Sequence, residues 1–118
     1  RILFVDDEMI IIELGTDMLT HLGYQVESFQ NPLKALSTLK AEPNRYDLVI
    51  TDFNMPEMNG DVLAQEIEKF NPDLPVILCS GYQEWGNPKD TLPIVLKAVL
   101  HKPFTLSELT RTIRKVLA

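Results

Sequence analysis

Short uninterrupted runs of hydrophobic residues recur along this chain, and they stop abruptly at polar residues. Apolar runs of roughly four to eight residues bounded by turn residues are typical of strands buried on both faces of a sheet. One further segment alternates polar and apolar residues, which indicates an edge strand. The predicted strands are residues 2–5, 25–29 (the edge strand), 47–51, 75–79 and 98–100.

Between the strands, apolar residues return at spacings of three and four, the pattern of helices with one buried face. Gly23 is expected to end the first helix, and Asn31 to cap the second with Pro32 in its first turn. Asp61 is expected to open the third helix and Thr105 to cap the last. The predicted inner residues are Ile11, Leu14, Met18 and Leu22 in the first helix, Leu36 and Leu39 in the second, Leu63, Ile67 and Phe70 in the third, and Leu106, Leu109, Ile113 and Val116 in the last.

The segment between Ser80 and Ala98 departs from this regularity. Glycine and proline residues (Gly86, Pro88 and Pro93) fall where a fourth helix of the alternation should lie. A proline inside a helix costs about 3 kcal/mol or more, because it removes a hydrogen bond and clashes with the preceding turn. We therefore expect any helix here to be short or broken and to lie within residues 88–97.

Strands and helices in alternation predict an α/β fold, a parallel sheet with right-handed crossovers and helices on both faces. The 118 residues suffice for one domain, residues 1–118. No signal peptide precedes the first strand. Because the chain starts at Arg1, without a Met and directly on an apolar run, we expect a domain excised from a longer protein. No apolar run is long enough for a membrane span, the net charge of −6 disfavours nucleic-acid binding, and the single cysteine, Cys79, favours a cytoplasmic location.

Polar side chains follow the predicted strands at the ends where ligands bind in open α/β sheets. Asp6 and Asp7 follow the first strand, Asp52 the third, Ser80 the fourth and Lys102 the fifth. Two carboxylates about 4 Å apart repel each other by roughly 4 kcal/mol at an effective dielectric constant near 20. A divalent cation together with the lysine would neutralise the three acids. Oxygen ligands with open positions suit Mg²⁺, which we therefore expect as the cofactor.

A carboxylate beside Mg²⁺, an ammonium and a hydroxyl can act as a nucleophile toward phosphorus and form an aspartyl phosphate. Asp52 is the candidate nucleophile, because a buried strand delivers it to the loop that follows. Mg²⁺ and Lys102 would neutralise charge on the transferred group. The Ser80 hydroxyl and the Gly81 backbone N–H could donate hydrogen bonds to its oxygens.

These motifs, taken together and in order, resemble the receiver domain of two-component response regulators. The resemblance covers nearly the whole chain. It implies a flavodoxin-like (βα)5 fold with strand order 2-1-3-4-5. The matching pieces are Val5-Asp6-Asp7-Glu8, Ile50-Thr51-Asp52-Phe53-Asn54-Met55-Pro56 with Asn59-Gly60, Ser80-Gly81, and Lys102-Pro103-Phe104.

The resemblance implies a role for each matching residue. Asp52 would accept a phosphoryl group from a phosphohistidine on a sensor histidine kinase or a histidine phosphotransfer domain. Lys102 would bind the phosphoryl oxygens, and Ser80 would move toward them. A cis peptide bond is implied before Pro103. The implied metal ligands are Asp6, Asp7, Asp52 and the backbone carbonyl of Asn54.

The resemblance also bears on the chain's biological context. The Ser80-Gly81-Tyr82 and Lys102-Pro103-Phe104 segments look similar to receivers fused to hybrid sensor histidine kinases, although a stand-alone regulator or an effector fusion remains open. The implied module signals rather than catalyses a metabolic reaction, and assists only its own phosphorylation and dephosphorylation. Direct contact with nucleic acid or membrane is not expected.

Two departures and three rival classes qualify this interpretation. Receivers usually carry an aromatic residue where this chain has Val99, and a fourth helix where this chain has Pro88 and Pro93. We therefore expect the response to concentrate in residues 81–97, which include Trp85. That altered relay keeps a pseudo-receiver interaction module as an alternative. A phosphatase of the haloacid-dehalogenase type would need an aspartate where Asn54 stands. A flavodoxin-like binding module would need a phosphate-binding loop where the acidic residues after the first strand would repel phosphate.

Overall fold

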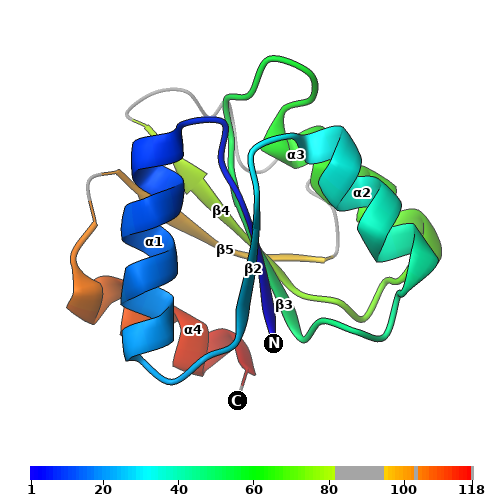
Figure 1. The fold of residues 1–118 in the computed structure, drawn as a ribbon. Coiled ribbons are helices and arrows are strands. Elements are labelled where there is room, and N and C mark those ends of the chain that lie inside the picture. Colours follow the sequence, from blue (N-terminus) through cyan, green and yellow to red (C-terminus); the bar gives the residue numbers. More distant parts are fainter. Residues whose placement is uncertain (82–94, 103, 118) are drawn as a thin grey trace.

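Five parallel strands form one sheet in the order β2-β1-β3-β4-β5, as the resemblance implied (Figure 1). The computed structural model describes residues 1–81, 95–102 and 104–117. The three central strands are buried at every position, which explains their uninterrupted apolar sequences. The strands are β1 (Ile2–Val5), β2 (Val26–Phe29), β3 (Leu48–Asp52), β4 (Val76–Ser80) and β5 (Leu96–His101).

The described helices cover both faces of the sheet. Helices α1 (Met9–His21) and α4 (Leu106–Leu117) lie on one face, and α2 (Pro32–Ala41) and α3 (Gly60–Phe70) on the other (Figure 1). Each face has its own hydrophobic core. Ile12, Leu19 and Ile113 belong to the first core, and Leu39, Leu63 and Ile67 to the second. No described helix combines the length and the apolar character that crossing a bilayer requires.

Local sequence signals explain where the helices begin and end. Gly23 has a φ of 97°, a conformation that favours glycine, and it follows the C-cap of α1 as predicted. The Asn31 side chain accepts a hydrogen bond from the N–H of Leu33 at 2.8 Å. Thr105 and Glu108 cap α4 reciprocally, with each backbone N–H donating to the other side chain at 3.1 Å.

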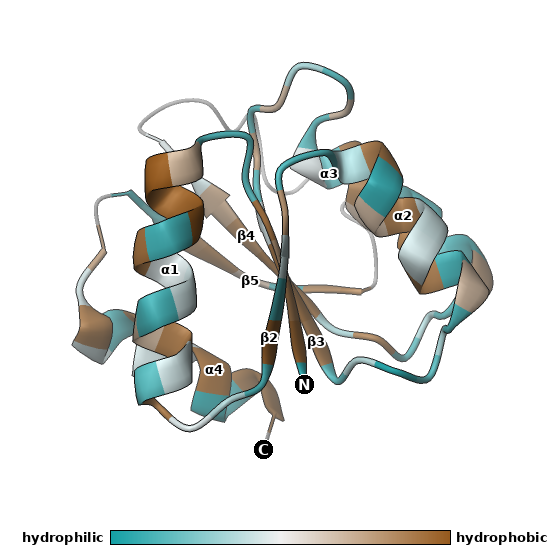
Figure 2. Cartoon of the chain, in the orientation of Figure 1, coloured by the Kyte–Doolittle hydropathy of each residue, from teal (hydrophilic) through white to brown (hydrophobic). Residues whose placement is uncertain are grey.

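Two predicted inner residues face solvent instead. Leu14 in α1 is 58% exposed and Leu106 in α4 is 39% exposed, whereas α1 buries Ile12 and Leu19. The first turns of α1 are apolar on nearly every side, with Met9-Ile10-Ile11-Ile12 in succession (Figure 2). Several helical faces therefore satisfy the same spacing, and only packing against the sheet selects one.

Several predicted boundaries shift by one or two residues. Helix α3 begins at Gly60, one residue before Asp61, and β5 begins at Leu96, two residues before Ala98. The predicted range of residues 88–97 for a short or broken helix is therefore wrong at its C-terminal end, because Leu96 and Lys97 belong to β5. The rest of the irregular segment, residues 82–94 with Trp85, and the bond before Pro103 lie outside the described residues. Val99 is a half-buried residue of β5 that pairs with Leu78.

Candidate functional site

The carboxyl ends of four neighbouring strands bring the predicted site residues to one edge of the sheet. Asp6 directly follows β1, Asp52 and Ser80 are the last residues of β3 and β4, and Lys102 directly follows β5. The strand register places these ends beside one another, since Val5 pairs with Thr51, Asp52 with Cys79, and Ser80 with His101. The sheet order therefore assembles residues that lie far apart in the sequence.

Lys102 connects the two buried acids of this edge. Its Nζ lies 2.6 Å from Oδ1 of Asp52 and 3.5 Å from Oδ2 of Asp6. Both carboxylate side chains are at most 5% exposed, whereas the lysine side chain is 27% exposed. Burial disfavours the charged lysine, but the hydrogen bond to Asp52 and the two negative charges outweigh it, and the pKa of Lys102 is raised. The site therefore holds a firmly charged ammonium.

Burial and neighbouring negative charges both disfavour the charged form of Asp6. Burial raises the pKa of its carboxyl to about 6, and the charges of Asp52 and Asp7 add to this effect against the opposing Glu8 N–H and Lys102. Oδ1 accepts a hydrogen bond from the Glu8 N–H at 3.0 Å. Oδ2 is buried and has no hydrogen-bond partner among the described residues. Lys102 Nζ lies 3.5 Å from this oxygen, beyond the distance of a strong hydrogen bond, so a further cation beside it would be stabilising.

A group of carboxylates beside Lys102 could hold such a cation. One carboxylate oxygen from each of Asp6, Asp7 and Glu8 lies within 4.8 Å of the other two. Asp6 is buried, Asp7 half-buried and Glu8 exposed, so the group opens from the interior to solvent. The sequence-based ligand set did not include Glu8, although the unbroken acidic run Asp6-Asp7-Glu8 was the signal for it. Hard oxygen donors of this kind suit Mg²⁺ or Ca²⁺.

The loop after β3 is held at both ends. The Phe53 N–H donates to the Cys79 carbonyl of β4 at 2.8 Å, and the Phe53 carbonyl accepts from the Gly60 N–H of α3 at 2.7 Å. Asn54 follows this double attachment and is exposed beside the edge. Its position is consistent with the predicted ligand role, which no contact in the structure tests.

Ser80 and Gly81 reach the same edge but form a local contact. The Ser80 hydroxyl is fully buried and donates to the Gly81 carbonyl at 3.0 Å, and the Ser80 carbonyl accepts from the Lys102 N–H at 2.8 Å. The neighbouring Cys79 thiol is also buried, which raises its pKa to about 12. The thiol is therefore unreactive at neutral pH, and the described chemistry of this edge is carried by oxygen and ammonium groups.

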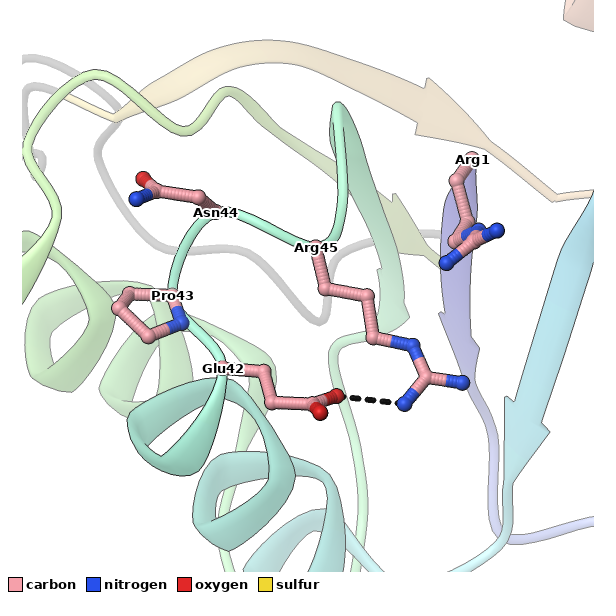
Figure 3. A pocket seen from close by; sticks show the side chains of 5 residues that line it. All are labelled: Arg1, Glu42, Pro43, Asn44 and Arg45. Carbon is pink, nitrogen blue, oxygen red and sulfur yellow. Dashed lines mark hydrogen bonds and ion pairs between the residues drawn. The ribbon is translucent and has the colours of Figure 1, made fainter.

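The opposite end of the sheet has a pocket of a different character. A hollow of about 410 Å³ is lined by Arg1, Glu42, Pro43, Asn44 and Arg45. Figure 3 shows these side chains, with Arg45 turned toward Glu42. Its charged groups are already matched, because Arg45 forms an ion pair with Glu42 and a second with Glu27 of β2. None of the residues that line it is a buried unsatisfied acid like Asp6, so the carboxyl end of the sheet is the better candidate site.

Comparison with known proteins identifies the family of this chain. Residues 2–114 match the family described as the response regulator receiver domain. The chain is 36% identical to the response regulator receiver protein CpdR of Brucella abortus, over 99% of this chain and 96% of that protein. It is 34% identical to the sensor kinase CckA of the same organism, over 98% of this chain. The chain spans 12% of CckA and 18% of two matching response regulators from Arabidopsis thaliana.

A solved structure agrees with the fold as well. The response regulator TrrA from Thermotoga maritima, determined in complex with Mg²⁺-BeF, superposes with a TM-score of 0.87. It is 34% identical in sequence, and the match covers 99% of this chain and 98% of that one. The family match extends over most of the chain, and it includes every strand end that carries a site residue. The chain therefore belongs to the response regulator receiver domain family.

Proposed function

We propose that this receiver domain is the phosphoacceptor module of a two-component phosphorelay, with Asp52 as the acceptor. One observation carries the proposal: Lys102 Nζ contacts both Asp52 and Asp6, beside an acidic group with an unsatisfied buried oxygen. If this cluster only stabilised the fold, one carboxylate would be enough to balance the charge of Lys102, but Lys102 contacts two and a third lies beside them. The excess negative charge is explained if a metal cation completes the site, and this cation together with Lys102 would then face the phosphoryl group on Asp52.

The residues present fit a magnesium ion. Asp6 and Asp7 offer carboxylate oxygens close to one another, with Glu8 beside them, and Asp6 Oδ2 is the unsatisfied one. We propose that Asp6, Asp7, Asp52 and the Asn54 carbonyl hold Mg²⁺. When bound, the ion would supply positive charge that offsets the phosphoryl oxygens.

The proposed transfer needs no further reactant. An Asp52 carboxylate oxygen attacks the phosphorus of a phosphohistidine, so that an O–P bond forms while the N–P bond breaks. The electron pair of the broken bond returns to the imidazole ring of the donor. Lys102 exchanges its contact with the Asp52 carboxylate for contact with the new phosphoryl oxygens, and the Ser80 hydroxyl and Gly81 N–H donate to them. In the described state the Ser80 hydroxyl donates to Gly81, so this role requires it to turn.

The phosphohistidine donor is proposed to lie against α1. An apolar groove of about 400 Å³ lies between α1 and the segment that joins β5 to α4, and it is lined in part by Leu14, Met18, Phe104 and Lys102. Because Lys102 both lines this groove and contacts Asp52, a protein seated there would lie next to the side chain that contacts the acceptor. Ile10 and Leu14 present exposed apolar surface beside it, at 76% and 58%. We propose the phosphohistidine-bearing domain of a sensor kinase as the occupant.

Two phosphodonors separate the acceptor chemistry from the docking. Leu14→Asp should slow transfer from a phosphorylated kinase domain at least about tenfold, because it places a charge on an apolar interface. Labelling by acetyl phosphate, which needs no docking, should be unchanged. An equal loss with both donors would contradict the docking proposal.

The central test is the identity of the acceptor. With Mg²⁺ and acetyl phosphate, the wild type should gain one phosphoryl group by intact mass, and Asp52→Asn should gain none. Asp73→Asn, in the exposed loop before β4, is the matched control and should be labelled like the wild type. Equal labelling of Asp52→Asn would refute the assignment, and an unlabelled wild type would favour the pseudo-receiver alternative.

The wider context is proposed from two relatives and from Cys79. The similarity to CckA supports fusion to a sensor kinase, while the similarity to CpdR supports a stand-alone regulator. A cytoplasmic location is proposed because the free cysteine Cys79 is buried and unpaired, as is common in reducing compartments.

A further inference from the structure

Helix α3 begins in very close contact with the end of β3. A β-carbon at position 60 would lie 2.3 Å from the backbone carbonyl oxygen of Asp52 and 2.6 Å from Cδ1 of Leu78. Both distances are far below normal van der Waals separation, so a side chain here would displace its neighbours. Gly60 does not have a positive φ, and the constraint on this position is therefore one of space.

The Asp52 carbonyl has little freedom to move away. The Thr51 hydroxyl donates to it at 3.0 Å, and the next N–H, of Phe53, is hydrogen-bonded to Cys79 of the fully buried strand β4. The Gly60 N–H in turn donates to the Phe53 carbonyl. The backbone of residues 52 and 53 is thus held between β4 on one side and the first turn of α3 on the other.

We propose that Gly60 is a positioning residue for the receiver site. Its missing side chain lets α3 rest directly on the Asp52 backbone, which fixes the Asp52 carboxylate beside Lys102 and the start of the loop that carries Asn54. This inference rests on the proposed function, because it assigns Gly60 a part in holding the metal ligands and the acceptor. A methyl group at position 60 would move these groups together without removing any of them.

The test compares two alanine variants of the same helix. Gly60→Ala should weaken Mg²⁺ binding by about tenfold or more and slow labelling by acetyl phosphate at least as much, as for lost supporting contacts around metal ligands. Ile67→Ala removes a fully buried side chain of α3 two turns later and destabilises the fold without touching Asp52. It should retain Mg²⁺ affinity within about twofold of wild type. Isothermal titration at a temperature where both variants are folded gives the affinities.

A double variant identifies which contact matters. Leu78→Ala in the Gly60→Ala protein opens room on the β4 side but leaves the added methyl group against the Asp52 carbonyl. The Mg²⁺ affinity of the double variant should remain about tenfold below that of the wild type. The double variant also tests the inference if Gly60→Ala alone does not fold. Restored affinity, or equal affinity of Gly60→Ala and Ile67→Ala, would overturn the inference. Failure of wild-type labelling despite Mg²⁺ binding would instead count against the proposed function alone, because the Mg²⁺ affinities still test Gly60.

Discussion

Both ends of the sheet carry a cluster of charged side chains, but the two clusters differ in burial and in charge balance. At the amino end, Arg45 pairs with Glu27 and Glu42, and all three side chains are at least 34% exposed. At the carboxyl end, Lys102 pairs with Asp6 and Asp52, which are almost completely buried. Water solvates the first cluster far better than it solvates the buried acids of the second.

The difference separates a cluster that is complete from one that requires a ligand. At the amino end, the hydrogen bond with Glu42 raises the pKa of Arg45, so its charged state is favoured. At the carboxyl end, burial raises the pKa of Asp6 to about 6, so its charged state is disfavoured. A charge that the fold holds in an unfavourable state is stabilised when a cation binds. Charged residues alone do not mark a functional site, whereas uncompensated buried charge does.

The largest expected effect is on folding stability, measured by removing the central cation at each end. Lys102→Met should lower the free energy of unfolding by about 3 kcal/mol in Mg²⁺-free buffer, because it leaves two buried carboxylates without their ammonium. Arg45→Met removes a cation from exposed partners that water can solvate. It should therefore lower the free energy of unfolding by only a small part of that amount. Urea unfolding at neutral pH measures both. Equal losses would show that the two clusters contribute alike and would remove the contrast.

Magnesium should affect only the carboxyl end. At about 100 times its Kd, bound Mg²⁺ should stabilise the wild type by about 2.7 kcal/mol, seen as a higher melting temperature. Asp7→Ala should abolish most of this gain, because it removes one of the clustered carboxylates. Glu42→Ala removes a carboxylate at the amino end, and Mg²⁺ should stabilise this variant as much as it stabilises the wild type. A melting temperature insensitive to Mg²⁺ over a wide titration would show that the acidic group is not a metal site.

The strand ends and helix caps around this site could be predicted from short stretches of the sequence. The change from apolar to polar residues marks the strand ends, so the sequence alone was enough to place Asp6, Asp52 and Lys102 there. Helix caps are equally local, and Asn31 and Thr105 cap as predicted. The parallel arrangement then follows from the alternation of elements, and it brings the strand ends together.

What the sequence did not predict depends on contacts between distant segments. Leu14 satisfied the helical spacing but faces solvent, because α1 is apolar on several sides and the sheet selects Ile12 and Leu19. Asn59-Gly60 was recognised as a piece of the resemblance, but the proximity of Gly60 to Asp52 depends on how α3 packs on β3. The hydrogen bond from the Ser80 hydroxyl to the adjacent Gly81 carbonyl is local, but the residue types do not specify which acceptor this hydroxyl takes.

The smallest expected effect lies at the amino end and depends on pH. The hydroxyl of Tyr46 is hydrogen-bonded to Glu27 at 2.9 Å, and burial together with this bond raises its pKa to about 12. The protonated Tyr46 hydroxyl therefore contributes fully to folding stability below about pH 10, the pKa of tyrosine in the unfolded chain. This contribution is lost as pH rises toward 12. Tyr46→Phe should cost about 1 kcal/mol at pH 8. Between pH 10 and 11 the wild type should lose roughly 1 kcal/mol more than the variant, by urea unfolding at each pH. Parallel pH dependence of the two proteins would show that the Tyr46 hydroxyl is not held in its protonated form by this cluster.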